Sequence, residues 1–182
     1  MDGLDAVRAF GEYEPPLREI LQAFKYEGRR GLAKPLGRML RRAGEDVLGS
    51  ADCVVPVPLH PWRRLRRGFN QADDLARTLG LPVIHALWRP WPTAPQAGLH
   101  AAARRRNVRG AFVVSPLLSD ASRERLASAS VVLVDDVRTT GATLEACAVV
   151  LRGLGVARVS ALTVARAAPP ATHRVKRRAA PE

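Results

Sequence analysis

The chain has 182 residues, 47% of them hydrophobic, which is enough for one globular domain with a substantial core. No apolar run approaches the roughly 20 residues of a membrane-spanning helix, and the opening MDGLDAVRAF lacks the basic and apolar regions of a signal peptide, so we expect a cytoplasmic protein. The net charge of +12 suits an anionic partner, such as nucleic acid, a phosphorylated metabolite or an acidic surface.

The positive charge also has an explanation that involves no partner. Arginine far outnumbers lysine and alanine is abundant, as a GC-rich genome would produce whatever the function. Aromatic residues make up only 5% of the chain, so stacking surfaces for single-stranded nucleic acid are scarce. The charge alone therefore leaves nucleic-acid binding open.

Amphipathic helices are predicted in the first part of the chain. Apolar residues recur at helical spacing over 17–24 and again over 32–47. A short buried strand follows over 53–58, where two prolines end it in a stiff loop. The arginine-rich stretch 59–69, LHPWRRLRRGF, is predicted to be a loop.

The middle of the chain alternates between short elements and loops. Asn70 is suited to be the N-cap of a helix over 72–79. The segments predicted after it are a strand at 81–87, a proline-broken loop at 88–100, a strand at 111–114 and a polar insertion at 115–130.

A strand, a helix and a strand are predicted near the end of the chain, at 131–134, 144–154 and 157–165. Strand–helix–strand units of this length are right-handed and place their two strands parallel in one sheet. Residues 169–182, PPATHRVKRRAAPE, have too little apolar content to pack and are predicted to form a disordered basic tail.

The cysteines and histidines do not form a metal-binding pattern. Cys53 and Cys147 lie in separate apolar segments, each without a second cysteine nearby. The histidines are scattered at positions 60, 85, 100 and 173. Structural zinc needs clustered ligands, so no zinc site is predicted.

The segment VVLVDDVRTTGAT predicts the chemistry. Asp135 and Asp136 follow the strand at 131–134, and a Thr/Gly turn at 139–143 opens the next helix. A helix N-terminus offers free backbone N–H groups and a partial positive charge, so it binds phosphate. The two acids suit sugar hydroxyls or a divalent metal. The segment therefore predicts a site for a phosphorylated sugar.

Other nucleotide-binding classes do not fit. The P-loop pattern G-x-x-x-x-G-K-[ST] is absent, and so is the Rossmann fingerprint. Gly153-Leu-Gly155 lies at a helix end and is better explained as a C-cap. Acids at a strand end also orient loops in some proteins, and the adjoining phosphate turn favours the ligand site over that structural role.

The same segment resembles the phosphoribosyl-pyrophosphate (PRPP) signature of type I phosphoribosyltransferases. Together with LREILQAFKYEGRRGLAKPLG, VVPVPLHPWRRLRRGFNQADDLA and QAGLHAAARRRNVRGAF, it resembles one branch of that superfamily, the ComF family with its GntX-like members. The four stretches cover most of residues 13–165, in the family's order. The resemblance implies an α/β fold with a central, mostly parallel sheet flanked by helices. It places the phosphoribosyltransferase-like domain at 13–168 and the basic tail at 169–182.

The resemblance also implies roles for individual residues. Asp135 and Asp136 would hold the ribose hydroxyls, directly or through Mg²⁺, and would be the catalytic acids. The residues that would wrap the 5′-phosphate are Thr139, Thr140, Gly141, Ala142 and Thr143. The pyrophosphate loop and its hood would comprise Pro58, Leu59, His60, Arg66 and Arg67, the two arginines otherwise belonging to a solvated loop. Arg104 and Asn107 match an R-x-x-N element of the family, with no chemistry that we can assign.

In this superfamily C1 of PRPP loses pyrophosphate through an oxocarbenium-like transition state, which Mg²⁺ and arginines stabilise. Purine-salvage members carry an aspartate base where this chain has Thr139. A threonine hydroxyl is not basic near neutral pH, so purine salvage is not expected. Orotate-type members also have threonine there, and PRPP chemistry with another acceptor stays allowed.

One departure concerns the start of the chain. ComF relatives commonly begin with a four-cysteine zinc module, which this sequence lacks, and residues 1–12 are expected to be a linker or a remnant of it. Two functions follow from the resemblance. The first is a PRPP-binding protein or phosphoribosyltransferase linked to DNA uptake or DNA utilisation. The second is an accessory protein of transformation that binds single-stranded DNA or other competence proteins without turnover. A silent PRPP-sensing domain is a third, weaker alternative.

Overall fold

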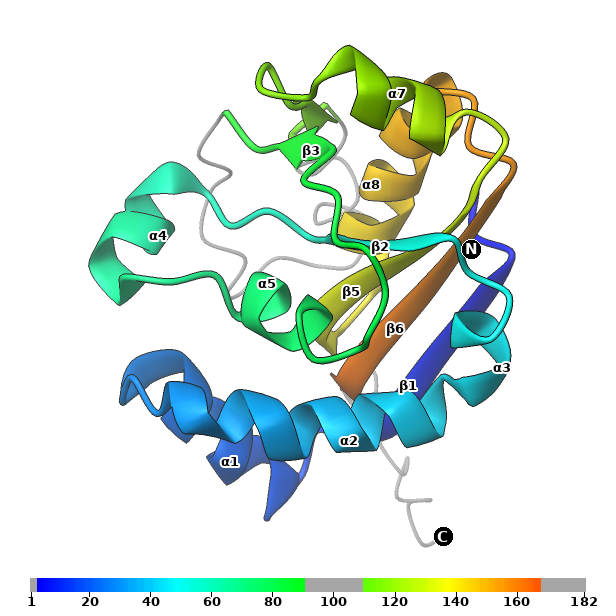
Figure 1. Ribbon diagram of the computed structural model, residues 1–182. Coiled ribbons are helices and arrows are strands. Elements are labelled where there is room, and N and C mark those ends of the chain that lie inside the picture. The colour runs from blue at the N-terminus through cyan, green and yellow to red at the C-terminus, as the bar shows by residue number, and fades with distance from the viewer. Residues whose placement is uncertain (1–2, 91–109, 168–182) are drawn as a thin grey trace, which may run out of the picture.

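The computed structural model describes residues 3–90 and 110–167, which are built around a four-stranded parallel sheet (Figure 1). The strands lie in the order β1-β6-β5-β2, so β6 and β5 are central. Their bounds are Ala6–Glu12 (β1), Cys53–Pro56 (β2), Ser130–Arg138 (β5) and Arg158–Arg166 (β6). In Figure 1 the arrowheads of β5 and β6 point toward the side on which α1, α4 and α5 lie.

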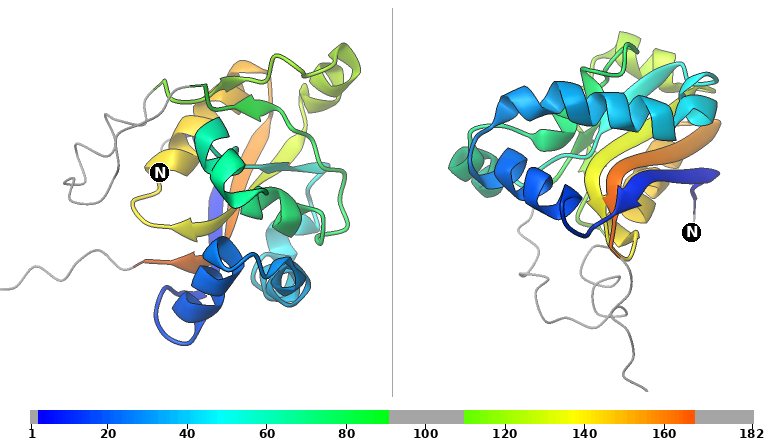
Figure 2. Two further views of the ribbon diagram at one scale, coloured as in Figure 1. Left: turned by 90° about the vertical axis from the view of Figure 1, so that its left-hand side faces the viewer. Right: turned by 90° about the horizontal axis from the view of Figure 1, so that it is seen from below.

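Helices cover both faces of the sheet (Figure 2). The first face carries α1 (Leu17–Tyr26), the 3₁₀ turn η1 (Arg30–Leu32), α2 (Ala33–Ala43), α3 (Glu45–Leu48) and α5 (Gln71–Ala76). The second carries α8 (Ala142–Gly153) with α7 (Asp120–Leu126) and the antiparallel pair β3 (Leu87–Trp88) and β4 (Val113–Val114). Helix α4 (Pro61–Arg67) projects beyond the sheet on the side of α1 and α5.

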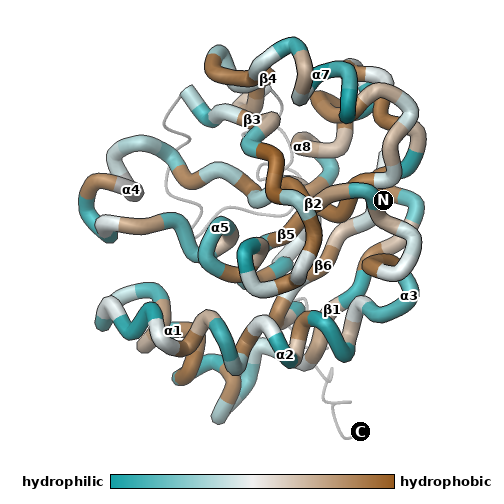
Figure 3. Tube along the Cα trace, viewed as in Figure 1, coloured by the Kyte–Doolittle hydropathy of each residue, from teal (hydrophilic) through white to brown (hydrophobic). Residues whose placement is uncertain are grey.

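The core is divided into two layers by the sheet. On β5, Val131 and Leu133 pack with α8, whereas Val132 and Val134 pack with α1, α2 and α5. This is the alternation of a strand that is buried on both faces. Figure 3 shows the hydrophobic colour along the central strands. Asp135 and Asp136 are the next residues along β5, and by the same alternation they face opposite layers of the molecule.

The fold class is confirmed. β5 and β6 are parallel neighbours joined through α8, and the sheet is flanked by helices as the resemblance implies. Asn70 is the N-cap of α5, with its side-chain oxygen accepting a hydrogen bond from the Ala72 N–H at 3.3 Å. Within the described residues, no helix is both long and apolar enough to cross a bilayer.

Several predicted boundaries are wrong. The stretch 59–69 contains helix α4, because its arginines are good helix formers and Pro61 suits a first helical position. The strand predicted at 81–87 is reduced to a bridge at Val83 and the start of β3, and α7 forms within the polar insertion. β5 continues through both acids to Arg138, because β6 pairs with it along its full length.

Residues 6–12, predicted as a linker, form strand β1 of the main sheet. β1 pairs with β6 from Ala6 to Glu12, and Leu4 and Val7 pack against the core. Asp5 accepts hydrogen bonds from Arg152 and from the Val159 N–H. The domain therefore begins before residue 13. The predicted loop at 88–100 and the predicted tail at 169–182 lie largely or wholly outside the described residues.

Candidate functional site

The two adjacent acids lie toward the carboxyl end of the central strand β5. Asp135 is in register with Thr163 of β6 and keeps partial solvent exposure. Asp136 is buried on the opposite face, where its Oδ2 is 2.8 Å from Nζ of Lys25, a residue in the last turn of α1. Consecutive residues of one strand thus present carboxylates to two different layers.

The surroundings of the two acids shift the pKa values of Asp135 and of its neighbour Lys25. Burial, and next the neighbouring charge of Asp136, raise the pKa of Asp135 to about 7, although the Asp136 N–H donates a 2.8 Å hydrogen bond to it. Burial alone would lower the pKa of Lys25, but the charge and hydrogen bond of Asp136 outweigh burial and raise it. The Lys25 amine is therefore cationic near neutral pH.

The Thr/Gly turn connects β5 to the N-terminus of α8. Gly141, the N-cap, has φ = +84°, a left-handed conformation that glycine adopts without steric cost. The Thr140 hydroxyl accepts a hydrogen bond from the Ala142 N–H at 3.4 Å. The N–H groups of the first helical turn have no partner inside the helix and point to the turn. A hollow of about 20 Å³ lies here, lined by Asp135 and residues 137–144.

A larger cavity of about 250 Å³ adjoins this hollow. Asp135 and Thr143 line both, so the hollow at the Thr/Gly turn and the larger cavity share part of their walls. The other residues of the cavity wall are Lys25, Tyr26, Val57, Pro58, Leu59, Arg67, Asn70, Gln71, Arg89 and Asp136. The wall thus combines carboxylates with lysine, arginine and amide donors.

The turn after β2 contributes its predicted residues only in part. Pro58 and Leu59 line the cavity, and the Asn70 amide fixes this turn by donating to the Val57 carbonyl at 3.1 Å. His60 lies outside the lining, and its Nδ1 accepts a hydrogen bond from the Trp62 N–H at 3.2 Å.

Of the two predicted hood arginines, Arg67 reaches the cavity and Arg66 is exposed on α4. Arg67 donates to the Gln71 side-chain oxygen at 3.1 Å and to the Tyr26 hydroxyl at 3.2 Å, and it lies over the Tyr26 ring. These contacts tie α4 to α1 and α5 at the mouth of the cavity. Arg104 and Asn107 lie outside the described residues.

The sequence did not identify several cavity residues, among them Lys25, Gln71 and Arg89. Gln71 and Arg89 are buried, and Arg89 lies over the Phe112 ring at 5.2 Å. Lys25 had a detectable signal. It stands four residues after Leu21, on the apolar stripe of α1, and a charge on such a stripe needs a partner.

Comparison with known proteins gives a consistent assignment. The sequence profile of the phosphoribosyl transferase domain matches residues 64–179. Competence protein F of Haemophilus influenzae is 35% identical over 173 residues, covering 90% of this chain and 73% of that protein. The DNA utilization protein YhgH of Escherichia coli is 34% identical over 169 residues, covering 85% of this chain and 69% of that protein.

Two further similarities are more distant. The competence protein ComFC of Bacillus subtilis is 29% identical over 161 residues, covering 87% of this chain and 63% of that protein. Among solved structures, an allosteric regulatory enzyme of purine biosynthesis is similar with a TM-score of 0.46 and 24% identity, over 74% of this chain and 25% of that chain.

Proposed function

Because this chain belongs to the ComF family of the phosphoribosyltransferase superfamily, we propose that it binds PRPP, or a related ribose 5-phosphate ligand, with Mg²⁺. The observation that carries the proposal is that two kinds of group, carboxylates and a helix-opening Thr/Gly turn, lie at adjoining hollows with a shared wall. Asp135 and Thr143 line both the hollow at the phosphate turn and the larger cavity. A ligand with a ribose beside a phosphate matches that pairing.

The arrangement of these residues suggests how the ligand is oriented in the site. The 5′-phosphate fits the turn at 139–143, where N–H groups and hydroxyls gather without a lysine. The ribose then lies beside Asp135 and Asp136, whose carboxylates accept hydrogen bonds from its hydroxyls. The pyrophosphate extends toward Pro58, Leu59 and Arg67 on the far wall of the cavity. An arginine fork suits phosphate oxygens geometrically.

Magnesium fits the same residues. Mg²⁺ prefers oxygen ligands and is commonly bound by one or two carboxylates together with substrate phosphates and water. Asp135 and Asp136 are the carboxylates on the cavity wall. Bound there, the ion would supply positive charge to a departing pyrophosphate.

Transfer of the ribosyl group would use the same residues in a dissociative reaction. Cleavage at C1 places positive charge on the ribose, and the nearby carboxylates stabilise that charge, while Arg67 offsets the negative charge of the leaving group. Thr139, exposed at the start of the turn, cannot act as a base toward a purine. We therefore expect pyrophosphate release, if assayed against a nucleobase panel, to be absent with purines.

We also propose a role in DNA uptake or DNA utilisation. This proposal is supported by two relatives, a competence protein and a DNA utilization protein, each of which aligns with most of this chain. PRPP binding would then serve that process, either through turnover or by reporting the ligand.

The test of PRPP binding is a Mg²⁺/PRPP titration followed by thermal unfolding. A ligand that binds only the folded chain stabilises it by about 2.7 kcal/mol at 100 times its Kd. We expect wild type to be stabilised and the double variant Asp135→Asn/Asp136→Asn to gain nothing. Equal stabilisation of both proteins by PRPP would contradict the proposal.

A matched control removes two acids elsewhere. Asp120 and Glu124 are exposed on α7, outside the cavity. The variant Asp120→Asn/Glu124→Gln changes the net charge by the same amount as the site variant. It is expected to keep the full response to PRPP.

One observation favours a second function, binding of single-stranded DNA. Helix α4 has the sequence PWRRLRR, and its Trp62 and Leu65 are 70% and 77% exposed. An exposed aromatic ring among arginines is a stacking surface with positive charge beside it. Tyr26, 70% exposed, adjoins α4 through Arg67. Any DNA binding is proposed to involve this surface.

Fluorescence anisotropy with a labelled single-stranded oligonucleotide tests this second function. We expect log K to fall linearly with log salt, and Trp62→Ala to weaken binding by about tenfold. The same measurement on a chain that ends at residue 168 separates α4 from the basic C-terminal residues. Loss of binding in that shortened chain, with no effect of Trp62→Ala, would contradict the role of α4.

A further inference from the structure

Lys25 connects the first helix of the chain to the acids of β5. The buried residues of α1, Leu17, Leu21 and Phe24, hold the helix against the sheet, and Lys25 follows them in its last turn. Its Nζ is 2.8 Å from Asp136 Oδ2, and the two side chains are only 14% and 11% exposed. A buried amine is stable in its charged form only when it is paired, so this contact fixes the position of the ammonium.

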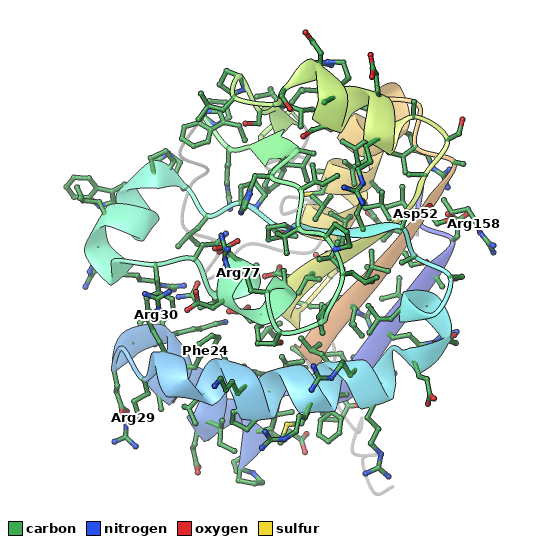
Figure 4. All side chains as sticks on the ribbon, in the orientation of Figure 1. Phe24, Arg29, Arg30, Asp52, Arg77 and Arg158 are labelled. Atoms are coloured by element: carbon green, nitrogen blue, oxygen red, sulfur yellow. The ribbon has the colours of Figure 1, made fainter. Side chains whose placement is uncertain are left out.

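The end of α1 is anchored to the elements that form the opposite wall. The Phe24 and Phe69 rings lie 5.7 Å apart, and Arg30 donates to both carboxylate oxygens of Asp74 at 2.7 and 2.8 Å. Figure 4 shows Phe24 and Arg30 between the layer of α1 and α2 and helix α5. Because the backbone is held on both sides, movement of the Lys25 ammonium is confined to its flexible four-carbon stem.

The charges on the cavity wall suit an incoming anion. Lys25, Arg67 and Arg89 line the cavity together with Asp135 and Asp136, so its described wall carries more cationic side chains than acids. A ribose hydroxyl or a metal ion at Asp136 would compete with Lys25 for the carboxylate. A pyrophosphate group in the same cavity would offer the displaced ammonium a new partner of higher negative charge.

Lys25 also lies in the part of the cavity that the proposed function assigns to the pyrophosphate. It belongs to the wall of the larger cavity with Pro58, Leu59 and Arg67, and it is not among the described residues that line the hollow at the Thr/Gly turn. An ammonium in this position can contact the pyrophosphate end of a ligand whose 5′-phosphate occupies the turn.

We propose that Lys25 is a pyrophosphate-binding residue that neutralises Asp136 in the ligand-free protein and moves its ion pair to the pyrophosphate when PRPP binds. The exchange breaks one ion pair and forms another, and it involves no covalent step. The inference rests on the proposed PRPP binding and adds to it a residue that, together with Arg67, distinguishes PRPP from ribose 5-phosphate.

The first test compares three ligands by isothermal titration calorimetry in Mg²⁺: PRPP, inorganic pyrophosphate and ribose 5-phosphate. Loss of one charged contact predicts that Lys25→Gln weakens PRPP and pyrophosphate about 10- to 100-fold and leaves ribose 5-phosphate within about threefold. Lys34, exposed on α2, provides the matched control, and Lys34→Gln is expected to bind all three ligands as wild type does.

A second set of variants covers the case in which Lys25→Gln, with Asp136 left unpaired, does not fold. Lys25→Met/Asp136→Asn removes both charges of this pair, whereas Asp136→Asn keeps the Lys25 ammonium at the cavity wall without its carboxylate partner. If Lys25 contacts pyrophosphate, adding Lys25→Met to Asp136→Asn weakens pyrophosphate binding by a further 10-fold or so. If Lys25 only neutralises Asp136, the two variants bind pyrophosphate equally, and the proposal is overturned.

The outcomes separate this proposal from the function on which it rests. Wild type that binds neither PRPP nor pyrophosphate contradicts the proposed function itself. Wild type that binds PRPP, with Lys25→Gln equally weakened for PRPP and ribose 5-phosphate, leaves the function intact and makes Lys25 structural. Selective loss of PRPP and pyrophosphate, with ribose 5-phosphate retained, supports the proposal.

Discussion

Burial decides the chemistry of both cysteines. Cys53 in β2 and Cys147 in α8 are fully buried, and neither forms a disulfide. Burial raises the pKa of the Cys53 thiol to about 11 and that of Cys147 well above its usual value. We expect neither thiol to react with a disulfide reagent in the native protein at pH 8, and both to react after denaturation. Rapid labelling of native protein would contradict the burial of these thiols.

A pH-dependent contribution to stability comes from Asp73 on α5. Its carboxylate accepts hydrogen bonds from His85 at 2.7 Å and from Arg77 at 3.0 Å. Burial alone would raise the pKa of Asp73, but these two partners outweigh burial and lower it. The stability gained is therefore present above the pKa of the unfolded chain, about 4, and is lost as pH falls through the lower folded value.

Asp73→Asn is accordingly expected to destabilise the protein by about 1 kcal/mol at pH 7, with the difference from wild type shrinking below about pH 4. Urea unfolding at a series of pH values measures this. Glu124→Gln on the exposed surface of α7 is the control and should show no such trend. A difference that stays constant down to pH 3 would show that the carboxylate charge is not responsible.

At the scale of residues, the sequence predicted those parts of the site that are contiguous in the chain. Asp135, Asp136 and the turn at 139–143 follow one another, so their proximity needs no knowledge of the fold. Lys25, Gln71 and Arg89 come from three distant segments of the chain and meet the acids only because the chain folds around β5. His60 was placed at the site by the resemblance, yet α4 begins next to it and its ring caps the helix start.

Helix α2 closely approaches the turn after α5 at one glycine, Gly37. A Cβ atom at Gly37 would lie 2.6 Å from Thr78 Cβ, and the Thr78 hydroxyl is engaged with the Leu75 carbonyl at 2.6 Å. Gly37→Ala therefore forces α2 away from the end of α5 and is expected to cost about 1–3 kcal/mol in the free energy of unfolding. Chemical denaturation measures the change.

Gly31 is the matched control for Gly37. A Cβ atom there would meet nothing within 4 Å, and its φ is not positive. Gly31→Ala is expected to change stability by less than about 0.5 kcal/mol. Equal effects of the two substitutions would mean that the contact between α2 and α5 adapts without cost.

At the scale of elements, periodicity identified the long helices and the central strands but misplaced the short elements. α1, α2 and α8 carry long apolar stripes, and β5 and β6 are rich in buried apolar residues, so local pattern indicates them. β3 and β4 are two residues long and exist because they pair with each other. Pairing between distant segments leaves little trace in either sequence. The apolar segment 81–87 predicts a strand by its composition, but among the described residues it pairs with other strands only at Val83 and Leu87.

The whole molecule depends on its edge strand β1. Residues 6–12 pair with β6, and Asp5 reaches α8 through Arg152, so these residues hold two layers together. Deleting residues 1–12 would expose the edge of β6 and apolar surface beneath Leu4 and Val7. We expect this deletion to reduce the free energy of unfolding by more than about 2 kcal/mol, as measured in urea.

Deleting residues 169–182 is the counterpart, and it is expected to leave stability unchanged because that sequence has little apolar content. A chain lacking residues 1–12 that is as stable as wild type would restore their interpretation as a linker. The sequence could not predict the role of β1, because the seven-residue segment AVRAFGE has no long apolar run and becomes a strand only through β6.

The opposite orientations of Asp135 and Asp136 have a consequence for how such a protein diverges. Because one carboxylate belongs to the α8 layer and the other to the α1 layer, a substitution in one layer changes the packing around one carboxylate and leaves the packing around the other in place. A related protein can keep β5 and the turn to α8 while the helices on the opposite face change. New specificity then arises by replacing one half of a binding site rather than by rebuilding the whole.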